Sequence, residues 1–178
     1  WHENVKYFEI SNANNELVGS FYTDLFARNG KRGGAWMDEC VVRKDIAGTD
    51  TRPVGYLVCN FPPPDESGAS FLTHTDVVTL FHEFGHMLHH LLTRITYPSI
   101  SGINGVPWDA VELPSQFMEN FAWCYDVLEK CSAHQDSGKS MPREVFDNLQ
   151  ASRNFGEALA MLRQIELALF DFRLHANY

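Results

Sequence analysis

The most distinctive chemical pattern in this 178-residue sequence is His82-Glu83-Phe84-Gly85-His86. Histidines four residues apart lie one turn apart on the same face of an α-helix, so both imidazoles can reach one metal ion. Glu83 lies about 100° round the helix from His82, where a carboxylate can take a proton from water without binding the metal. The pattern predicts one Zn²⁺ per chain, with His82 and His86 as ligands and Glu83 as the catalytic base.

A catalytic zinc site needs a third protein ligand and leaves one position for water. One class of zinc peptidase takes a third histidine from a position that is Leu92 in this chain, so that class is excluded. His90 continues the row of His82 and His86, but three side chains in line along one helix cannot readily surround a tetrahedral ion. We therefore interpret His89 and His90 as surface groups or as groups that support the ligands.

A carboxylate from a second helix is the natural third ligand. Glu112 and Glu119 are seven residues apart and therefore share one face of such a helix. Geometry favours Glu112, which directly follows a glycine-rich loop, but leaves Glu119 open as the ligand. Glu119 or Asp109 could then hold a ligating imidazole through its other ring nitrogen.

The histidine motif lies within a segment that has its own helix signals. Thr73 and Asp76 have the spacing of a capping box, and apolar residues then recur with a helical period to about residue 93. This context argues against the alternative to a metal site, in which the two histidines are only structural and Glu83 is an exposed surface residue. Gly85 costs about 1 kcal/mol relative to alanine inside a helix, which is tolerable where a neighbouring backbone approaches. A simple packing notch is the alternative explanation.

The other elements predict an α+β fold, in which a small N-terminal β-sheet precedes a mainly helical, zincin-like catalytic core. We expect a hairpin over residues 4–28, a glycine-led strand over 31–37 and a buried strand over 53–61. Helices are expected over 110–131, 142–152 and 155–175. The whole chain, 1–178, is interpreted as one catalytic-core segment with a β-rich part (1–72) and a helical part (73–178).

The segment Gly33-Gly34-Ala35-Trp36 is a candidate substrate-binding strand. Two glycines leave room for another backbone, so an extended peptide could add to this edge through main-chain hydrogen bonds. The alternative is that the glycine pair only forms a bulge.

Composition excludes several other classes of protein. The net charge of −9 offers no basic stripe for nucleic acid, and no apolar run is long enough to cross a membrane. Four scattered cysteines and the lack of a signal peptide favour a reducing, cytoplasmic location and no disulfide framework. The chain starts at Trp1 within strand-like sequence, which suggests a fragment of a longer protein, and we expect that protein to be monomeric.

The sequence resembles the thimet oligopeptidase and neurolysin family of zinc peptidases in four separate runs: KRGGAWMDEC (31–40), FHEFGHMLHHLL (81–92), SGINGVPWDAVELPSQFMENF (101–121) and MLRQIELALFDFRLH (161–175). The resemblance implies that His82, His86 and Glu112 bind zinc and that Glu83 is the base. It therefore selects Glu112 over Glu119. The family also has a C-terminal segment with substrate-contacting Tyr and His residues and a large N-terminal helical region, neither of which matches this chain.

The leading hypothesis is a zinc metalloendopeptidase that hydrolyses internal bonds of short peptides. A second hypothesis is a zinc-binding fragment that is catalytically incompetent because C-terminal substrate-binding residues are missing. A third is a structural α+β domain without metal. Zinc content separates the third from the other two, and peptide turnover separates the first from the second.

Overall fold

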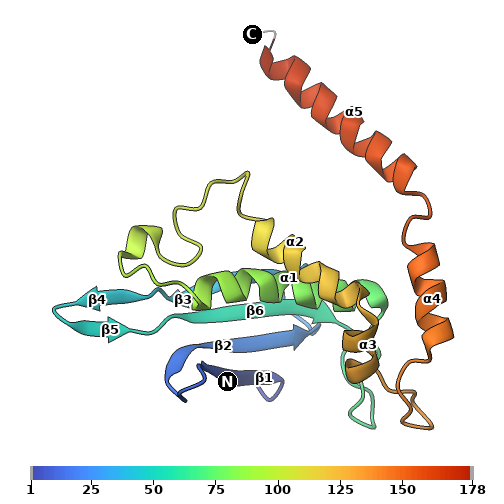
Figure 1. Ribbon diagram of the computed structural model, residues 1–178, viewed down its shortest axis with the longest axis horizontal. Coiled ribbons are helices and arrows are strands. Elements are labelled where there is room, and N and C mark those ends of the chain that lie inside the picture. Colours follow the sequence, from blue (N-terminus) through green and yellow to red (C-terminus); the bar gives the residue numbers. More distant parts are fainter. Residues whose placement is uncertain (1, 177–178) are drawn as a thin grey trace. The chain divides into compact units, whose positions relative to one another are not determined.

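The computed structural model describes residues 2–176 and has an α+β fold, as the sequence predicts. A four-stranded sheet has the strand order β1-β2-β6-β3, formed by β1 (Val5–Ser11), β2 (Leu17–Phe26), β6 (Val54–Phe61) and β3 (Trp36–Val41) (Figure 1). β1 pairs antiparallel with β2, β2 pairs parallel with β6, and β6 pairs antiparallel with β3. β3 therefore lies at one edge of the sheet and β1 at the other.

The hairpin over residues 4–28 is confirmed, and its turn shows why it forms there. Asn15 has a φ of 60°, a left-handed conformation that asparagine tolerates better than most residues. The Asn12 side chain accepts hydrogen bonds from the backbone N–H groups of Asn14 and Glu16. Local turn chemistry thus sets the register of β1 against β2.

Two features of the strands differ from the sequence prediction. β3 begins at Trp36 rather than residue 31, because Gly34 has a φ of 99°, which interrupts an extended chain. A second, two-stranded sheet was not predicted and consists of β4 (Lys44–Ile46) and β5 (Thr49–Thr51). Its turn is Ala47-Gly48, with positive φ at both residues, which is the geometry of a tight hairpin.

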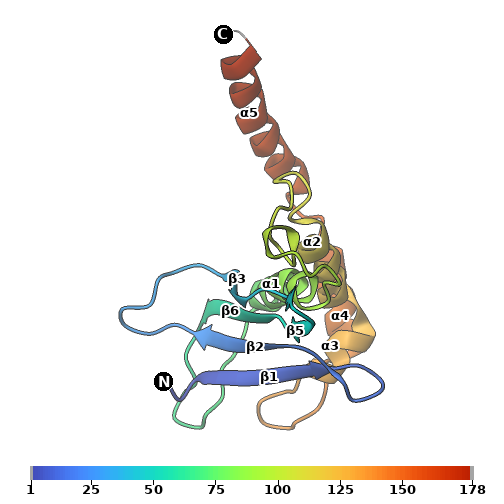
Figure 2. The ribbon, with the colours of Figure 1, turned by 90° about the vertical axis from the view of Figure 1, so that its left-hand side faces the viewer.

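Helix α1 (His74–Leu91) packs against one face of the four-stranded sheet and encloses the core (Figure 2). Thr73 and Asp76 form the expected capping box at its start. The buried core comprises Phe21, Leu57, Cys59, Phe61, Met87 and Leu91. Along β6 every second residue is buried and the residues between them are half-buried. One face of the strand is therefore more completely covered than the other.

The expected single helix over 110–131 is wrong. The chain forms α2 (Leu113–Glu119), a 3₁₀ turn at Asn120–Trp123, and then α3 (Tyr125–Cys131). The break occurs at Cys124, whose backbone is extended with φ −105° and ψ 125°. The loop between α1 and α2 contains one further 3₁₀ turn, Pro98–Ile100.

The chain divides into two compact units, Trp1–Ala122 and Trp123–Tyr178. The first unit contains the sheet with α1 and α2. The second contains α3, α4 (Arg143–Ser152) and α5 (Glu157–Ala176), and in it the Tyr125 ring packs against Phe146 with ring centroids 5.3 Å apart. No helix among the described residues is long and apolar enough to cross a membrane.

Candidate metal centre

The two histidines of the motif lie side by side on α1. The ring centroids of His82 and His86 are 5.1 Å apart, and both side chains are mostly buried, with 25% and 14% of their surfaces exposed. Their helical spacing brings them to one site, as expected for residues four apart.

Gly85 brings the start of α2 against this face of α1. A Cβ added to Gly85 would lie 2.5 Å from Ser115 Cα and 2.6 Å from the Pro114 carbonyl oxygen. No side chain fits between the two backbones, so the glycine serves the approach of a neighbouring backbone.

Glu112, the residue that precedes α2, reaches both histidines because of this approach. Its Oε2 lies 3.2 Å from His82 Nε2 and 3.1 Å from His86 Nε2. One ligand atom from each residue falls within 4.8 Å of the others. In a tetrahedral site with zinc bonds of about 2.0–2.1 Å, neighbouring ligand atoms are about 3.3 Å apart. The two distances from Glu112 therefore match a zinc site, and two imidazoles with one carboxylate are ligand types that zinc binds.

Further contacts orient these candidate ligands. Glu119 Oε1 lies 2.7 Å from His82 Nδ1, so a proton on Nδ1 would leave the Nε2 lone pair free toward Glu112. The Ser115 hydroxyl, which is fully buried, donates to Glu112 Oε2 at 2.8 Å. This hydrogen bond, with His86 and His82 nearby, holds the pKa of Glu112 below its usual value despite some burial.

Of the two residues considered for holding an imidazole, the structure thus brings Glu119 to the cluster. Asp109 is exposed in the turn before Glu112. Within residues 2–176 it makes no hydrogen bond or ion pair with His82 or His86. Ser115 was not identified from the sequence as a hydrogen-bond donor to Glu112. Its position three residues after Glu112, near the start of a helix, could have indicated this contact.

Glu83 lies beside the cluster and is almost fully buried, with 7% of its surface exposed. Burial raises the pKa of its carboxyl above the usual value, and the nearby Glu112 carboxylate adds to the rise. His82 and a hydrogen bond from the backbone N–H of Met37 act in the opposite direction. A raised pKa brings a carboxylate closer to the range in which it can accept and return a proton at neutral pH.

Burial lowers the pKa of the His86 imidazole, although the nearby Glu112 opposes this shift. The neutral imidazole, with a free lone pair on one nitrogen, is the form that binds metal. The shift therefore favours a form of His86 that can act as a ligand.

The interpretation of His90 as a surface group or a support for the ligands is wrong. The side chain is fully buried, and its Nε2 lies 3.2 Å from the Val41 carbonyl oxygen and 3.1 Å from that of Val54. It ties α1 to β3 and β6. The signal was its position on the helical face shared with Met87 and Leu91. His89 is half-buried, and burial lowers its pKa.

The candidate substrate segment leads into β3, the edge strand of the four-stranded sheet. Trp36 opens edge strand β3, while Gly33, Gly34 and Ala35 precede it in a loop. Nothing lies within 4 Å of a Cβ added to Gly33 or Gly34, so the space beside both is open. The next residue, Met37, contacts Glu83 through its backbone N–H. The edge strand therefore passes close to Glu83, the candidate base, at Met37.

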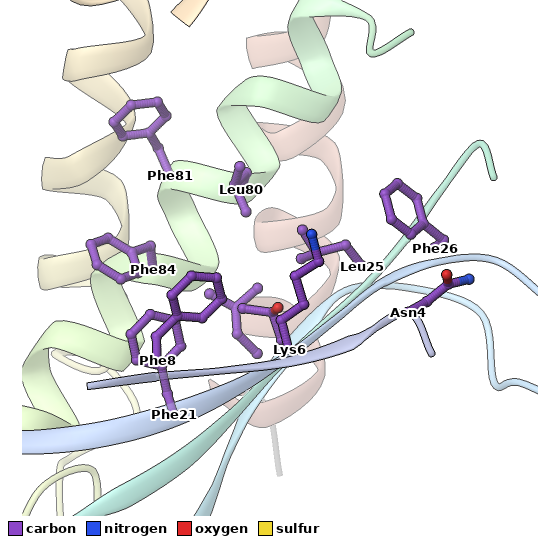
Figure 3. A pocket seen from close by; sticks show the side chains of 11 residues that line it. Asn4, Lys6, Phe8, Phe21, Leu25, Phe26, Leu80, Phe81 and Phe84 are labelled. Atoms are coloured by element: carbon purple, nitrogen blue, oxygen red, sulfur yellow. The ribbon is translucent and has the colours of Figure 1, made fainter. Parts of the chain in front are cut away.

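An apolar cavity of about 480 Å³ lies between the sheet and α1 (Figure 3). Most of the side chains that line it are apolar, among them Phe8, Phe21, Leu80 and Phe84. Asn4 and Lys6 also line it. None of the three candidate metal ligands lines this cavity, so it is separate from the candidate metal centre.

Comparison with known proteins adds an independent line of support. Oligopeptidase A of Salmonella typhimurium and that of Escherichia coli are each 55% identical over 179 residues, covering all of this chain and 26% of the relative. An organellar oligopeptidase A of Arabidopsis thaliana is 42% identical over 185 residues, covering 100% of this chain and 23% of the relative. The chain spans about a quarter of the length of these curated relatives. The model of Peptidase family M3 matches residues 1–178, and the chain belongs to that family.

Proposed function

We propose that this chain carries the catalytic centre of a zinc metalloendopeptidase that hydrolyses internal bonds of short peptides. The observation that carries the proposal is the position of Glu83, buried beside three converging metal-ligand side chains and in contact with an edge strand. The peptidase family and the relatives named oligopeptidase A support the same reaction class.

His82, His86 and Glu112 would hold the ion, with Glu119 and Ser115 keeping two of them in orientation. A bound Zn²⁺ would supply Lewis-acid chemistry, which lowers the pKa of water and polarises a carbonyl group. Glu83 would receive the proton that the attacking water loses. Its raised pKa would then let it return that proton to the leaving amine.

The substrate would lie extended along the free edge of β3 and the glycine segment before it. Main-chain hydrogen bonds to an edge strand give affinity without strong dependence on side chains, which suits an enzyme for varied short peptides. The Met37 N–H at Glu83 would keep this edge in register with the base. A reducing compartment such as the cytoplasm belongs to this proposal, and the four free cysteines are compatible with it.

A zinc-binding module without turnover is the second candidate. Both candidates use the same three metal-ligand side chains, and they differ in whether Glu83 acts on a bound peptide. Zinc analysis together with a peptide assay on the same preparation distinguishes the two candidates, since only the first predicts hydrolysis.

Zinc content is the first test of the proposal. Protein prepared without chelator should contain close to one equivalent of zinc, and the His82→Ala, His86→Ala double variant should contain almost none. An exposed histidine outside the site, His175, provides a matched control because His175→Ala should leave the zinc content unchanged. Full zinc retention by the double variant would falsify the assignment.

A further inference from the structure

The glycine segment before β3 is held against β6 by side chains rather than by the strand ladder. The backbone pairing of β3 with β6 ends at Trp36↔Val58, and continuing this register would place Gly34 opposite Asn60. There the Asn60 side-chain amide donates to the carbonyl oxygens of Arg32 at 2.8 Å and Gly34 at 2.7 Å. The Asn60 side chain thus donates the hydrogen bonds to this segment that backbone N–H groups donate where β3 pairs with β6.

The start of the segment is anchored by Lys31. Its side chain is only 5% exposed, and its ammonium donates to the carbonyl oxygens of Phe26 at 2.9 Å and Cys59 at 2.6 Å. It also contacts both the backbone and the carboxylate of Asp24. These acceptors lie at the ends of β2 and β6, so Lys31 fixes the chain just before the residues that Asn60 holds.

The other side of the segment is open. Gly34 needs to be glycine because its φ is 99°. Gly33 has no such backbone requirement, yet a Cβ at either residue would meet nothing within 4 Å. The chain's own packing therefore does not explain a missing side chain at Gly33. Space for a second backbone would explain it.

We propose that Asn60 is a positioning residue for the peptide substrate. Its amide holds the carbonyl groups of Arg32 and Gly34 toward β6, so that the segment continues the line of the edge strand up to Met37 and Glu83. This inference rests on the proposed function. It adds that peptide affinity, and not metal binding, depends on a side chain that touches neither the metal site nor the base.

The test replaces Asn60 by aspartate, which has nearly the same shape but, when ionised, cannot donate to either carbonyl group. Asn60→Ala is a second variant that removes the donors without adding charge. Asn14→Asp makes the same chemical change in the exposed β1–β2 turn and is the matched control. Binding is measured in the Glu83→Gln background, so that the Kd of a fluorescent peptide is read without hydrolysis.

We expect both Asn60 variants to raise the peptide Kd about tenfold, the scale of one to two lost hydrogen bonds, while Asn14→Asp has no effect. With Glu83 present, KM should rise by a similar factor and kcat should change by less than about threefold. Zinc content should stay at the wild-type value in every variant. Hydrogen exchange at the backbone amides of residues 33–36 should become faster, whereas amides in β1 and β2 should keep their protection.

The outcomes separate this inference from the proposed function. Wild-type protein that binds zinc and peptide, together with an unchanged Kd in both Asn60 variants, overturns the role of Asn60 alone. Faster exchange with an unchanged Kd also overturns it, because the clamp then stabilises the loop without serving the substrate. Wild-type protein that binds no peptide overturns both proposals, and its zinc content tells whether the metal site fails as well.

Discussion

Replacing Gly85 with alanine should separate the two halves of the candidate metal centre. His82 and His86 lie on α1, whereas Glu112 lies at the start of α2, and the two backbones meet at Gly85. By helix propensity alone the substitution should stabilise α1 by about 1 kcal/mol. Tertiary contact and local propensity therefore predict opposite results.

The structure sets the size of the effect. The new Cβ would lie 2.5 Å from Ser115 Cα, whereas ordinary contacts begin at 3.4 Å, so the backbones must move apart by about 0.9 Å. Zinc–ligand distances in proteins are held to about ±0.2 Å, so a shift of this size takes the Glu112 carboxylate out of range. Since even the loss of a group that only orients a ligand costs 10–100-fold in metal affinity, we expect about 100-fold weaker zinc binding.

Competition with a chromophoric chelator measures this affinity directly. Gly33→Ala is the matched control, because a Cβ at that position meets nothing within 4 Å and its zinc affinity should equal that of the wild type. Circular dichroism establishes that the Gly85→Ala variant remains folded. A folded variant with zinc affinity within about threefold of the wild type would show that the α1–α2 contact does not set the position of Glu112.

Two further substitutions separate the roles assigned to glutamates at the site. Glu83→Gln should retain one equivalent of zinc but reduce peptide turnover about 10²–10⁴-fold, as measured with a quenched fluorescent peptide, and near-normal turnover would move the base to another residue. Glu119→Gln removes the carboxylate 2.7 Å from His82 Nδ1 and should weaken zinc binding about 10–100-fold in the chelator assay. An unchanged affinity would mean that Glu119 does not orient His82.

The local features of this protein were predictable because each depends on residues close together in the chain. The capping box at Thr73 and Asp76 starts α1, and the i, i+4 spacing of His82 and His86 puts both imidazoles on one face. The turn asparagines likewise predicted the β1–β2 hairpin. Backbone geometry alone determines these arrangements, so the sequence was sufficient for them.

Boundaries that depend on contacts between distant residues were not predictable. β3 starts at Trp36 because Gly34 has a φ of 99° and because Asn60, which is distant in the chain, holds the carbonyl groups of Arg32 and Gly34 in the preceding loop. The helix expected over 110–131 breaks at Cys124, although its residue pattern is compatible with a continuous helix. The pattern of apolar residues is too coarse to show such breaks.

The division of labour between two glutamates shows most clearly what tertiary structure decides. Spacing alone left Glu112 and Glu119 as alternative ligands, since residues seven apart share a helical face. In the fold, Glu112 lies at the Nε2 atoms of both histidines and Glu119 lies at Nδ1 of His82. The sequence by itself determined which residue types could form the centre. Only the close approach of α2 to Gly85, a contact between separate helices, determined which nitrogen each carboxylate faces.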